Sequence, residues 1–250
     1  MPGTEIIPAI DLLGGKCVRL AQGDYDQVTV YSGDPLEVAR QFEDAGIRRL
    51  HLVDLDGARS GGIVNAAVLG KISGGTRLIV DFGGGVTSNR ELRIAFDNGA
   101  HMITGGSIAV RDPALFLEWL ETWGSEKIIL GADSRDGLIA VQGWRQTTAL
   151  SVVDFIGTFR EKGISQVIST DISRDGMMTG PAILLYREIL ARHPGLRLVA
   201  SGGIASMEDI RLLAAEGLSG VITGKALYNG AISLKEIARY NLEVTDSSPG

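Results

Sequence analysis

Eight short apolar segments, separated by longer amphipathic ones, are the feature that most limits how this 250-residue chain can fold. Short runs rich in β-branched residues are typical of buried strands, and the periodicity between them is helical. The predicted strands cover residues 6–10, 49–53, 78–82, 101–104, 127–132, 166–170, 196–200 and 220–223. Strands that alternate with helices pair in parallel, and eight such units close into a barrel. The sequence therefore predicts an α/β fold, a single (β/α)8 TIM barrel.

Helix-start signals support this pattern. Asp34 precedes Pro35, so we expect Asp34 to cap a helix that begins with the proline, and Glu37 is placed for a capping box. Asp112 and Pro113 predict a second helix start of the same kind.

Composition narrows the classes of partner and cofactor. The net charge of −6 disfavours nucleic acid and anionic membranes as partners. The single cysteine, Cys17, excludes an internal disulfide and a cysteine metal cluster, and the three histidines are too far apart for a zinc motif, so we expect no metal. No signal-peptide pattern follows Met1, and no apolar run reaches the length of about 18 residues that a membrane span needs. We therefore expect a cytoplasmic protein without a membrane partner.

The segment 244–250, with the sequence VTDSSPG, has no periodicity. We expect one catalytic barrel domain over residues 1–243 and a disordered tail over residues 244–250. Nothing in the sequence indicates a partner subunit, and we expect a monomer.

Short motifs recur between the two halves of the chain. GGV at residues 84–86 returns as GGI at 202–204, and ITG at 103–105 returns at 222–224. The distance along the chain from Gly84 to Gly105 is 21 residues, and that from Gly202 to Gly224 is 22 residues. The sequence therefore predicts a half-barrel that occurs twice.

Two aspartates end predicted strands that such a repeat would place opposite each other. Asp11 closes the first strand immediately before two glycines, and Asp133 follows the fifth. A buried carboxylate is costly unless it is paired or has a function, and barrel active sites lie at the carboxyl ends of the strands. An aspartate there is also often only a turn former. The repeat favours an acid–base pair.

Four glycine turns follow the third, fourth, seventh and eighth strands. Such turns bring backbone N–H groups close to a phosphate oxygen, and the last two form the usual phosphate site of a barrel. The repeat predicts a second phosphate site opposite, and hence a long substrate with a phosphate at each end. Glycine turns occur in many α/β proteins, so the symmetry carries this prediction. The predicted phosphate-binding residues are Gly84, Gly85, Gly106, Ser107, Gly202, Gly203, Gly224 and Lys225.

Seven segments resemble, in register through all eight strands, the phosphoribosyl isomerase family of histidine biosynthesis. They are IPAIDLLGGKCVRLAQGDY, LHLVDLDGARSGGIVN, VDFGGGV, GADSRDGLIAVQGW, STDISRDGMMTGP, ASGGIAS and GVITGKALYNG. That family converts a phosphoribosylformimino aminoimidazole carboxamide ribotide, an aldose, into its ribulosyl ketose by an Amadori rearrangement. The resemblance implies an isomerase of amino-acid biosynthesis that has the (β/α)8 fold, binds a small-molecule ribotide with two phosphates and uses no metal or organic cofactor.

The resemblance also assigns roles to side chains. One carboxylic acid and one carboxylate suffice for this reaction if their surroundings separate their pKa values. The resemblance gives the general base to Asp11 and the general acid to Asp133, with Asp175 as a rival for the acid. Thr170 is placed to orient the substrate, and Arg19 to pair with a phosphate or carboxamide group.

Other polar and aromatic residues have weaker signals. Trp144 could stack on the substrate imidazole or merely pack a loop, and we favour stacking. Asp54 and Asp56 face the same mouth, but a structural hydrogen-bonding role is at least as plausible. We expect Asp136 to be a loop residue and His51 to be a hydrogen-bonded core histidine at the buried start of its strand.

Three alternatives are weighed against this function. The cyclase subunit of imidazole glycerol phosphate synthase, a lyase, has a similar barrel, but its first strand reads Cys-Leu-Asp with a later lysine, where this chain has Ala9-Ile10-Asp11 and Arg19. A bifunctional isomerase that also accepts phosphoribosyl anthranilate has an arginine where this chain has Gln142. A non-catalytic barrel that binds bisphosphates would be favoured only if the aspartates at the mouth were missing.

Overall fold

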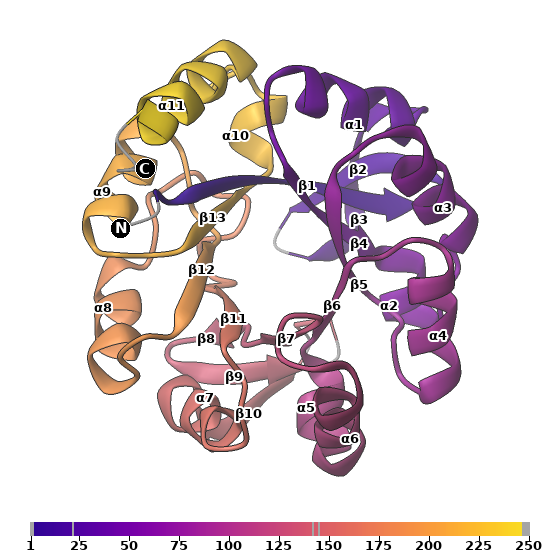
Figure 1. The fold of residues 1–250 in the computed structure, drawn as a ribbon, viewed down its shortest axis with the longest axis vertical. Coiled ribbons are helices and arrows are strands. Elements are labelled where there is room, and N and C mark those ends of the chain that lie inside the picture. Colours follow the sequence, from indigo (N-terminus) through magenta and orange to yellow (C-terminus); the bar gives the residue numbers. More distant parts are fainter. Residues whose placement is uncertain (1–2, 22, 142, 145, 247–250) are drawn as a thin grey trace.

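A closed ring of parallel strands forms the centre of the computed structural model, which describes residues 3–246 except 22, 142 and 145 (Figure 1). The ring consists of β1 (Glu5–Leu13), β4 (Arg49–Asp54), β5 (Ile79–Gly83), β6 (Met102–Gly105), β7 (Ile128–Gly131), β11 (Gln166–Thr170), β12 (Arg197–Ser201) and β13 (Gly220–Thr223). Each strand pairs with the next, and β13 pairs with β1, from Glu5 opposite Gly220 to Pro8 opposite Thr223. The predicted (β/α)8 barrel is confirmed, and each predicted strand overlaps one of these eight. The internal half-barrel repeat stays a prediction.

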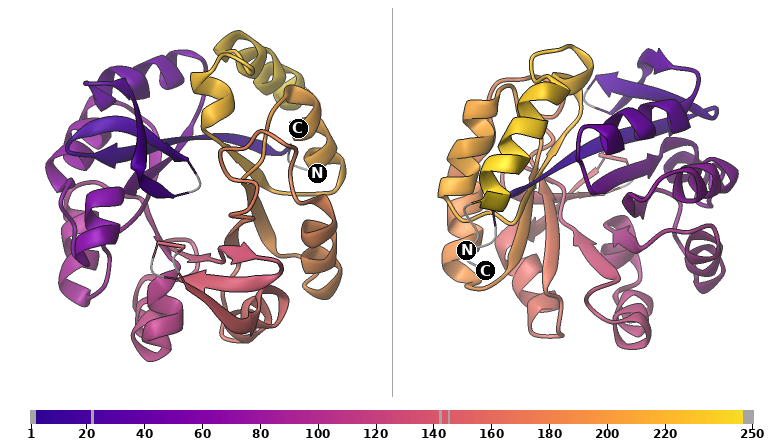
Figure 2. Two further views of the ribbon diagram at one scale, coloured as in Figure 1. Left: turned by 180° about the vertical axis from the view of Figure 1, so that it is seen from behind. Right: turned by 45° about the horizontal axis from the view of Figure 1, so that its top comes forward.

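Helices surround the strands as an outer layer (Figure 1 and Figure 2). In the described part of the chain they are α1 (Pro35–Asp44), α2 (Leu55–Ser60), α3 (Ala66–Gly75), α4 (Asn89–Asp97), α5 (Ser107–Arg111), α6 (Pro113–Trp123), α7 (Val152–Arg160), α8 (Ile183–Arg192), α9 (Met207–Ala215), α10 (Lys225–Tyr228) and α11 (Leu234–Asp246). Helix α11 includes residues 244–246, which the sequence had assigned to the tail. The rest of that predicted tail, 247–250, lies outside the described residues.

The two predicted helix starts are confirmed, with one difference. The Asp34 carboxylate accepts hydrogen bonds from the first turn of α1, and the Asp112 carboxylate does the same for α6. The expected capping box at α1 is wrong, because the backbone N–H of Asp34 donates to Ser32 Oγ at 3.0 Å instead of to Glu37. The box needs that N–H for the glutamate.

Two insertions of antiparallel strands extend the barrel at its mouth. β2 (Lys16–Ala21) and β3 (Asp24–Ser32) fold back beside β1, while β8 (Ser134–Arg135), β9 (Leu138–Val141) and β10 (Gln146–Ser151) form a second sheet after β7. Sequence periodicity did not predict them. Most residues of β3 are exposed, so the alternation of buried and exposed residues that marks a half-buried strand is weak there.

The barrel interior is a small apolar core of its own. Ile7, Ala9, Ile129, Ile168, Val199 and Ile222 pack together inside the ring. A larger core fills the space between strands and helices, because successive strand residues face opposite sides of the sheet. With the middle of the barrel filled, polar groups that work on a ligand have to lie at an end of the strands.

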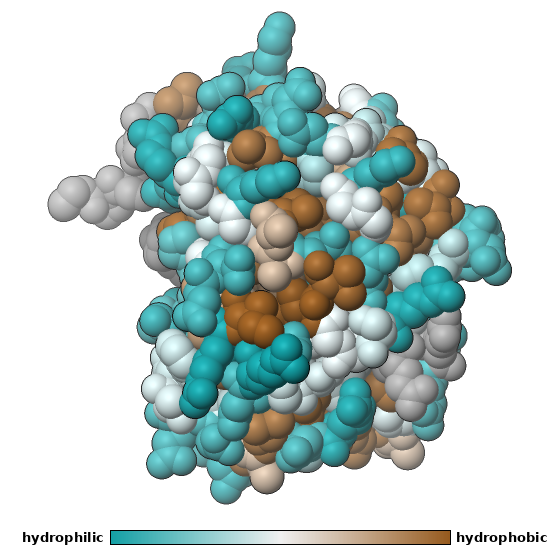
Figure 3. Space-filling view, turned by 90° about the vertical axis from the view of Figure 1, so that its right-hand side faces the viewer, coloured by the Kyte–Doolittle hydropathy of each residue, from teal (hydrophilic) through white to brown (hydrophobic). Residues whose placement is uncertain are grey.

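The outer surface is mixed in character. Figure 3 shows the face at the right-hand side of Figure 1, where hydrophilic residues surround a smaller gathering of hydrophobic ones. Among the residues that the structure describes, no helix is long and apolar enough to cross a membrane.

Candidate active site

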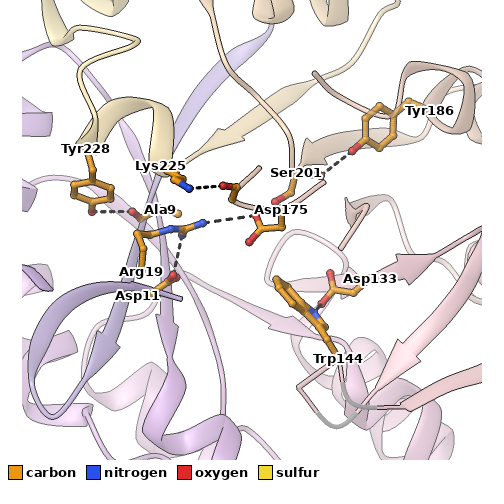
Figure 4. A network of polar contacts seen from close by, with 11 residues as sticks. Ala9, Asp11, Arg19, Asp133, Trp144, Asp175, Tyr186, Ser201, Lys225 and Tyr228 are labelled. Carbon is orange, nitrogen blue, oxygen red and sulfur yellow. Dashed lines mark hydrogen bonds and ion pairs between the residues drawn. The ribbon is translucent and has the colours of Figure 1, made fainter. Parts of the chain in front are cut away.

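One cavity at the carboxyl ends of the strands brings together every residue that the sequence singled out for the site. Its lining comes from strand ends and from the loops that follow them. Figure 4 shows its central polar contacts. The predicted residues in its wall are Asp11, Arg19, Gly84, Gly85, Gly106, Ser107, Asp133, Trp144, Thr170, Asp175, Gly202, Gly203, Gly224 and Lys225.

Arg19 joins two carboxylates in this cavity. Strand register places Asp11 of β1 opposite Val18 of β2, so Arg19 stands beside it. Arg19 Nη1 donates to Asp11 Oδ2 at 2.8 Å, and Nη2 lies 3.6 Å from Asp175 Oδ1 (Figure 4). The sequence had indicated a phosphate or carboxamide as the partner of Arg19. The structure adds a direct role in holding Asp11 and Asp175 close to each other.

Burial dominates the electrostatics of the two aspartates. It raises the pKa of Asp11, and the guanidinium of Arg19 opposes this rise. Burial likewise raises the pKa of Asp133, opposed by hydrogen bonds from Trp144 and Thr170. A carboxyl group with a raised pKa releases and recovers a proton more readily near neutral pH, as acid–base chemistry requires.

Trp144 is fixed to one of these aspartates. Its Nε1 donates to Asp133 Oδ2 at 2.8 Å. Its ring is also covered, because a Cβ on Gly23 would lie 2.8 Å from Trp144 Cε3. The indole therefore packs a loop and lines the cavity at the same time. Gln142, two residues before it, lies outside the described residues.

Glycine is required in two of the predicted phosphate turns. Gly84 and Gly202 both have φ near +91°, a conformation that side chains rarely adopt. A Cβ at Gly84 would lie 2.2 Å from the backbone oxygen of Asp54, and one at Gly202 would lie 2.7 Å from that of Asp171. Each turn thus packs closely on the backbone carbonyl group of an aspartate, Asp54 for Gly84 and Asp171 for Gly202.

In the other two turns, the predicted residues Gly106 and Gly224 have similar positions, whereas Gly105, which the ITG motif matches to Gly224, does not. Matching ITG with ITG pairs Gly105 with Gly224, but a Cβ at Gly105 would face Phe116, away from the cavity, whereas one at Gly224 would face Arg19. Gly106 is the counterpart of Gly224. Each precedes a short helix, with φ −101° and ψ −80° at Gly106 and φ −126° and ψ −83° at Gly224.

Lys225 connects the last turn to the loop that carries Asp175. Its Nζ donates to the backbone oxygen of Gly176 at 2.7 Å (Figure 4). The ammonium group therefore holds the residue after Asp175 as well as standing beside Gly224 at the start of α10.

Asp54 has the structural hydrogen-bonding role that the sequence left open for it. It is fully buried, and its carboxylate accepts hydrogen bonds of 2.6–2.8 Å from Gly57, Val64 and Asn65. Asp56 accepts from Asn65 of the same segment and from Gly14 in the turn between β1 and β2. These bonds fix the loop against which the Gly84 turn packs.

His51 is a site residue that sequence reasoning missed. It was expected at the buried start of its strand, but it is the third residue of β4 and its ring lines the cavity. The expected hydrogen-bond partner is present, since Nδ1 is bonded to Asp81 of β5. The signal lay in the register, which sets His51 between Ala9 and Asp81, and this becomes visible only once the three strands are adjacent.

Comparison with known proteins agrees with this geometry. A family model described as histidine biosynthesis protein matches residues 5–233. Similar proteins include one from Parabacteroides distasonis, 56% identical over 94% of this chain and 99% of its own length, and one from Bacteroides thetaiotaomicron, 57% identical over 93% and 98%. A third, from Flavobacterium johnsoniae, is 53% identical over 94% and 98%. All three are named 1-(5-phosphoribosyl)-5-((5-phosphoribosylamino)methylideneamino) imidazole-4-carboxamide isomerase.

Proposed function

The chain belongs to the histidine biosynthesis protein family, and from this premise we propose that it is an isomerase that converts the phosphoribosylamino aldose of its relatives' name into the ribulosyl ketose. The reaction is an Amadori rearrangement in histidine biosynthesis. The observation that carries the proposal is the presence of two carboxyl groups, the buried Asp11 and the half-buried Asp133, in one cavity between two pairs of glycine turns. They supply the acid and the base that this chemistry needs.

The proposed reaction begins with an acid. Asp133 protonates the oxygen of the aminosugar ring, the ring C–O bond breaks, and the nitrogen lone pair forms an iminium. Asp11 then takes the proton from the neighbouring carbon, and the electron pair of that C–H bond neutralises the iminium to give an enol. The enol becomes the ketose as the first carbon gains a proton and the hydroxyl loses one. Both carboxyl groups thereby return to their starting states, and no external reductant or oxidant is needed.

The contacts of the two candidate acids favour Asp133 over Asp175. Asp175 shares the Arg19 guanidinium with Asp11. Asp133 is hydrogen-bonded by the neutral side chains of Trp144 and Thr170, and burial raises its pKa. Burial outweighs these hydrogen bonds and the opposing charge of His51 in setting the pKa of Asp133, so we assign the acid to Asp133 and a substrate-orienting role to Asp175.

The glycine turns support a grip on both phosphates of the substrate. Gly84, Gly85, Gly106 and Ser107 would hold one phosphate, and Gly202, Gly203, Gly224 and Lys225 the other. In crystals grown with sulfate, anions should lie at both groups of residues. Anions found only elsewhere would contradict the two-ended grip.

The direct test of function is turnover. Purified protein should convert the aldose ribotide to the ketose, followed by NMR of the sugar carbons, without added metal or cofactor. The variant Asp11→Asn, which keeps the shape of the side chain, is the control. Absence of ketose formation by the folded wild-type protein would refute the proposal.

Two alternatives receive no support from the relatives' names: the cyclase and the bifunctional isomerase. Gln142 has no described structure, so poor turnover of phosphoribosyl anthranilate stays a prediction from the sequence alone. We further propose a cytoplasmic, monomeric enzyme that binds neither nucleic acid nor membranes; the net charge of −6 supports the last part of this proposal.

A further inference from the structure

A buried carboxylate with two basic partners interrupts the apolar interior of the barrel. Asp81 of β5 has no exposed surface. Its Oδ2 accepts from Arg49 Nε at 2.8 Å, its Oδ1 is bonded to His51 Nδ1, and Thr104 Oγ1 donates to it at 3.3 Å. The positive charge of Arg49 alone would balance the negative charge of Asp81. The presence of His51 as a second basic partner of Asp81 therefore needs a separate explanation.

His51 lies directly below the proposed base. It is opposite Ala9 in the parallel pairing of β4 with β1, and Asp11 follows two residues further along β1. The charged and titratable groups that act on the imidazole are Asp81 from β5, Asp11 from β1, Arg49 from its own strand and Asp133 from the loop after β7. Burial acts to lower the pKa of His51, but Asp81 outweighs it, so the pKa is raised and the ring tends to stay an imidazolium.

The side chain of His51 borders the cavity and keeps 14% of its surface exposed, whereas that of Asp81 has none exposed. Asp81 occupies Nδ1, and Nε2 has no hydrogen bond to any other described residue. The ring is part of the cavity wall. A buried cation is costly in free energy unless it is paired and has donors satisfied. The arrangement thus provides a fixed, charged N–H donor at the floor of the site.

Given the proposed isomerase function, on which this inference rests, we propose that Asp81 is a positioning residue that holds His51 so that Nε2–H donates to the hydroxyl oxygen on the carbon that Asp11 deprotonates. That oxygen becomes the carbonyl oxygen of the ketose. A hydrogen bond from cationic His51 to this oxygen draws electron density from the carbon as its C–H bond breaks, and it stabilises the enol that forms. No proton leaves His51 in this role.

The test is a double-mutant cycle on kcat and KM. Asp81→Asn and His51→Gln should each lower kcat about 10- to 100-fold, the usual effect of removing one hydrogen bond from a charged donor. KM should change less than threefold. Because Asp81 acts through His51, the double variant should be no slower than the slower single variant. His101→Gln, the same substitution at an exposed histidine, is the matched control and should resemble the wild type.

Histidine NMR separates this role from a purely structural one. With only three histidines in the chain, the His51 ring signals are identified by their loss in His51→Gln. In the wild type they should titrate above the ordinary midpoint of about 6.5, and in Asp81→Asn below the wild-type midpoint. If Asp81→Asn does not fold, His51→Gln, which keeps the Asp81–Arg49 pair, still tests the role through its kcat.

Any of three results would overturn the inference. The first is a double variant whose loss of kcat is the product of the two single losses. The others are an unchanged kcat in His51→Gln, and a titration midpoint of His51 that is the same in Asp81→Asn as in the wild type. Failure of the proposed function looks different, because the wild-type protein itself would then form no ketose.

Discussion

A single methyl group should reveal whether Arg19 controls the proposed base. In Gly224→Ala, the new Cβ would lie 2.7 Å from Arg19 Cζ and 2.8 Å from Nη1. The φ of −126° at Gly224 lies outside the left-handed region, and Gly106 in the opposite turn has similar φ and ψ angles, so a backbone cost of alanine is common to both positions. The strain specific to Gly224→Ala therefore falls on the guanidinium, at the end of a side chain that can shift.

The size of the effect follows from the distances. Ordinary contact begins near 3.4 Å, so the guanidinium must move by about 0.7 Å from its 2.7 Å separation. The same shift would lengthen the 2.8 Å bond to Asp11 Oδ2 to about 3.5 Å, where a hydrogen bond is effectively lost. A bond between charged groups contributes about 1.5–3 kcal/mol, which corresponds to about 10- to 150-fold in kcat if Arg19 holds Asp11 in the transition state.

Gly106→Ala supplies the matched control. Gly106 has a similar backbone conformation in the opposite turn, and its Cβ would meet Gly131 O at 3.5 Å, an ordinary contact. Steady-state turnover of the aldose ribotide should fall at least tenfold in Gly224→Ala and less than threefold in Gly106→Ala, with cooperative thermal unfolding retained in both. Equal losses would show that the methyl groups act on phosphate binding alone and would refute the reasoning about Arg19.

Three further predictions concern the same mouth. Asp11→Asn should lose about 10²–10⁴ in kcat with folding intact, whereas Asp136→Asn, in an exposed loop, should stay near the wild type in the same turnover assay. Gly84→Ala should reduce the free energy of unfolding by about 3 kcal/mol or more, because its Cβ would meet backbone at 2.2 Å, while Gly14→Ala, with open space around it, should cost about 1 kcal/mol in urea titrations. Asp133→Asn should raise the melting temperature at neutral pH. Burial raises the folded-state pKa of Asp133 above 3.8, so ionisation of this group opposes folding at higher pH. The rise in melting temperature of Asp133→Asn over the wild type should therefore shrink as the pH falls toward 4. A rise that became larger in acid would contradict this reasoning.

The sequence correctly predicted the strands whose two faces are both buried. The barrel strands have continuous apolar runs, and every predicted strand corresponds to an observed one. The hairpin of β2 and β3 was missed because a strand such as Asp24–Ser32 is mostly exposed and has little hydrophobic pattern to read. Such excursions depend on pairing with an edge already formed, which no local pattern describes.

Within the site, sequence reasoning found residues that occur in motifs and missed those that depend on register. Asp11 and Gly202 stand in recognisable local patterns. The contact of His51 with Asp81 spans 30 residues and exists only because β4 and β5 are adjacent. The ITG match at Gly105 has the same limit, since identical letters do not reveal which side of a strand a residue faces.

The pairing of β1 with β13 has a consequence for how the chain is made. Glu5 and Gly220, which face each other across the closing seam, are separated by nearly the whole length of the barrel sequence. At ribosomal speeds of about 5–20 residues per second, one edge of β1 would wait roughly 10–40 s for its partner to be synthesised. During that interval the nascent chain presents an open, apolar strand edge, the kind of surface that seeds aggregation. The seam thus leaves one edge of the first strand open to wrong pairing until the last strand emerges.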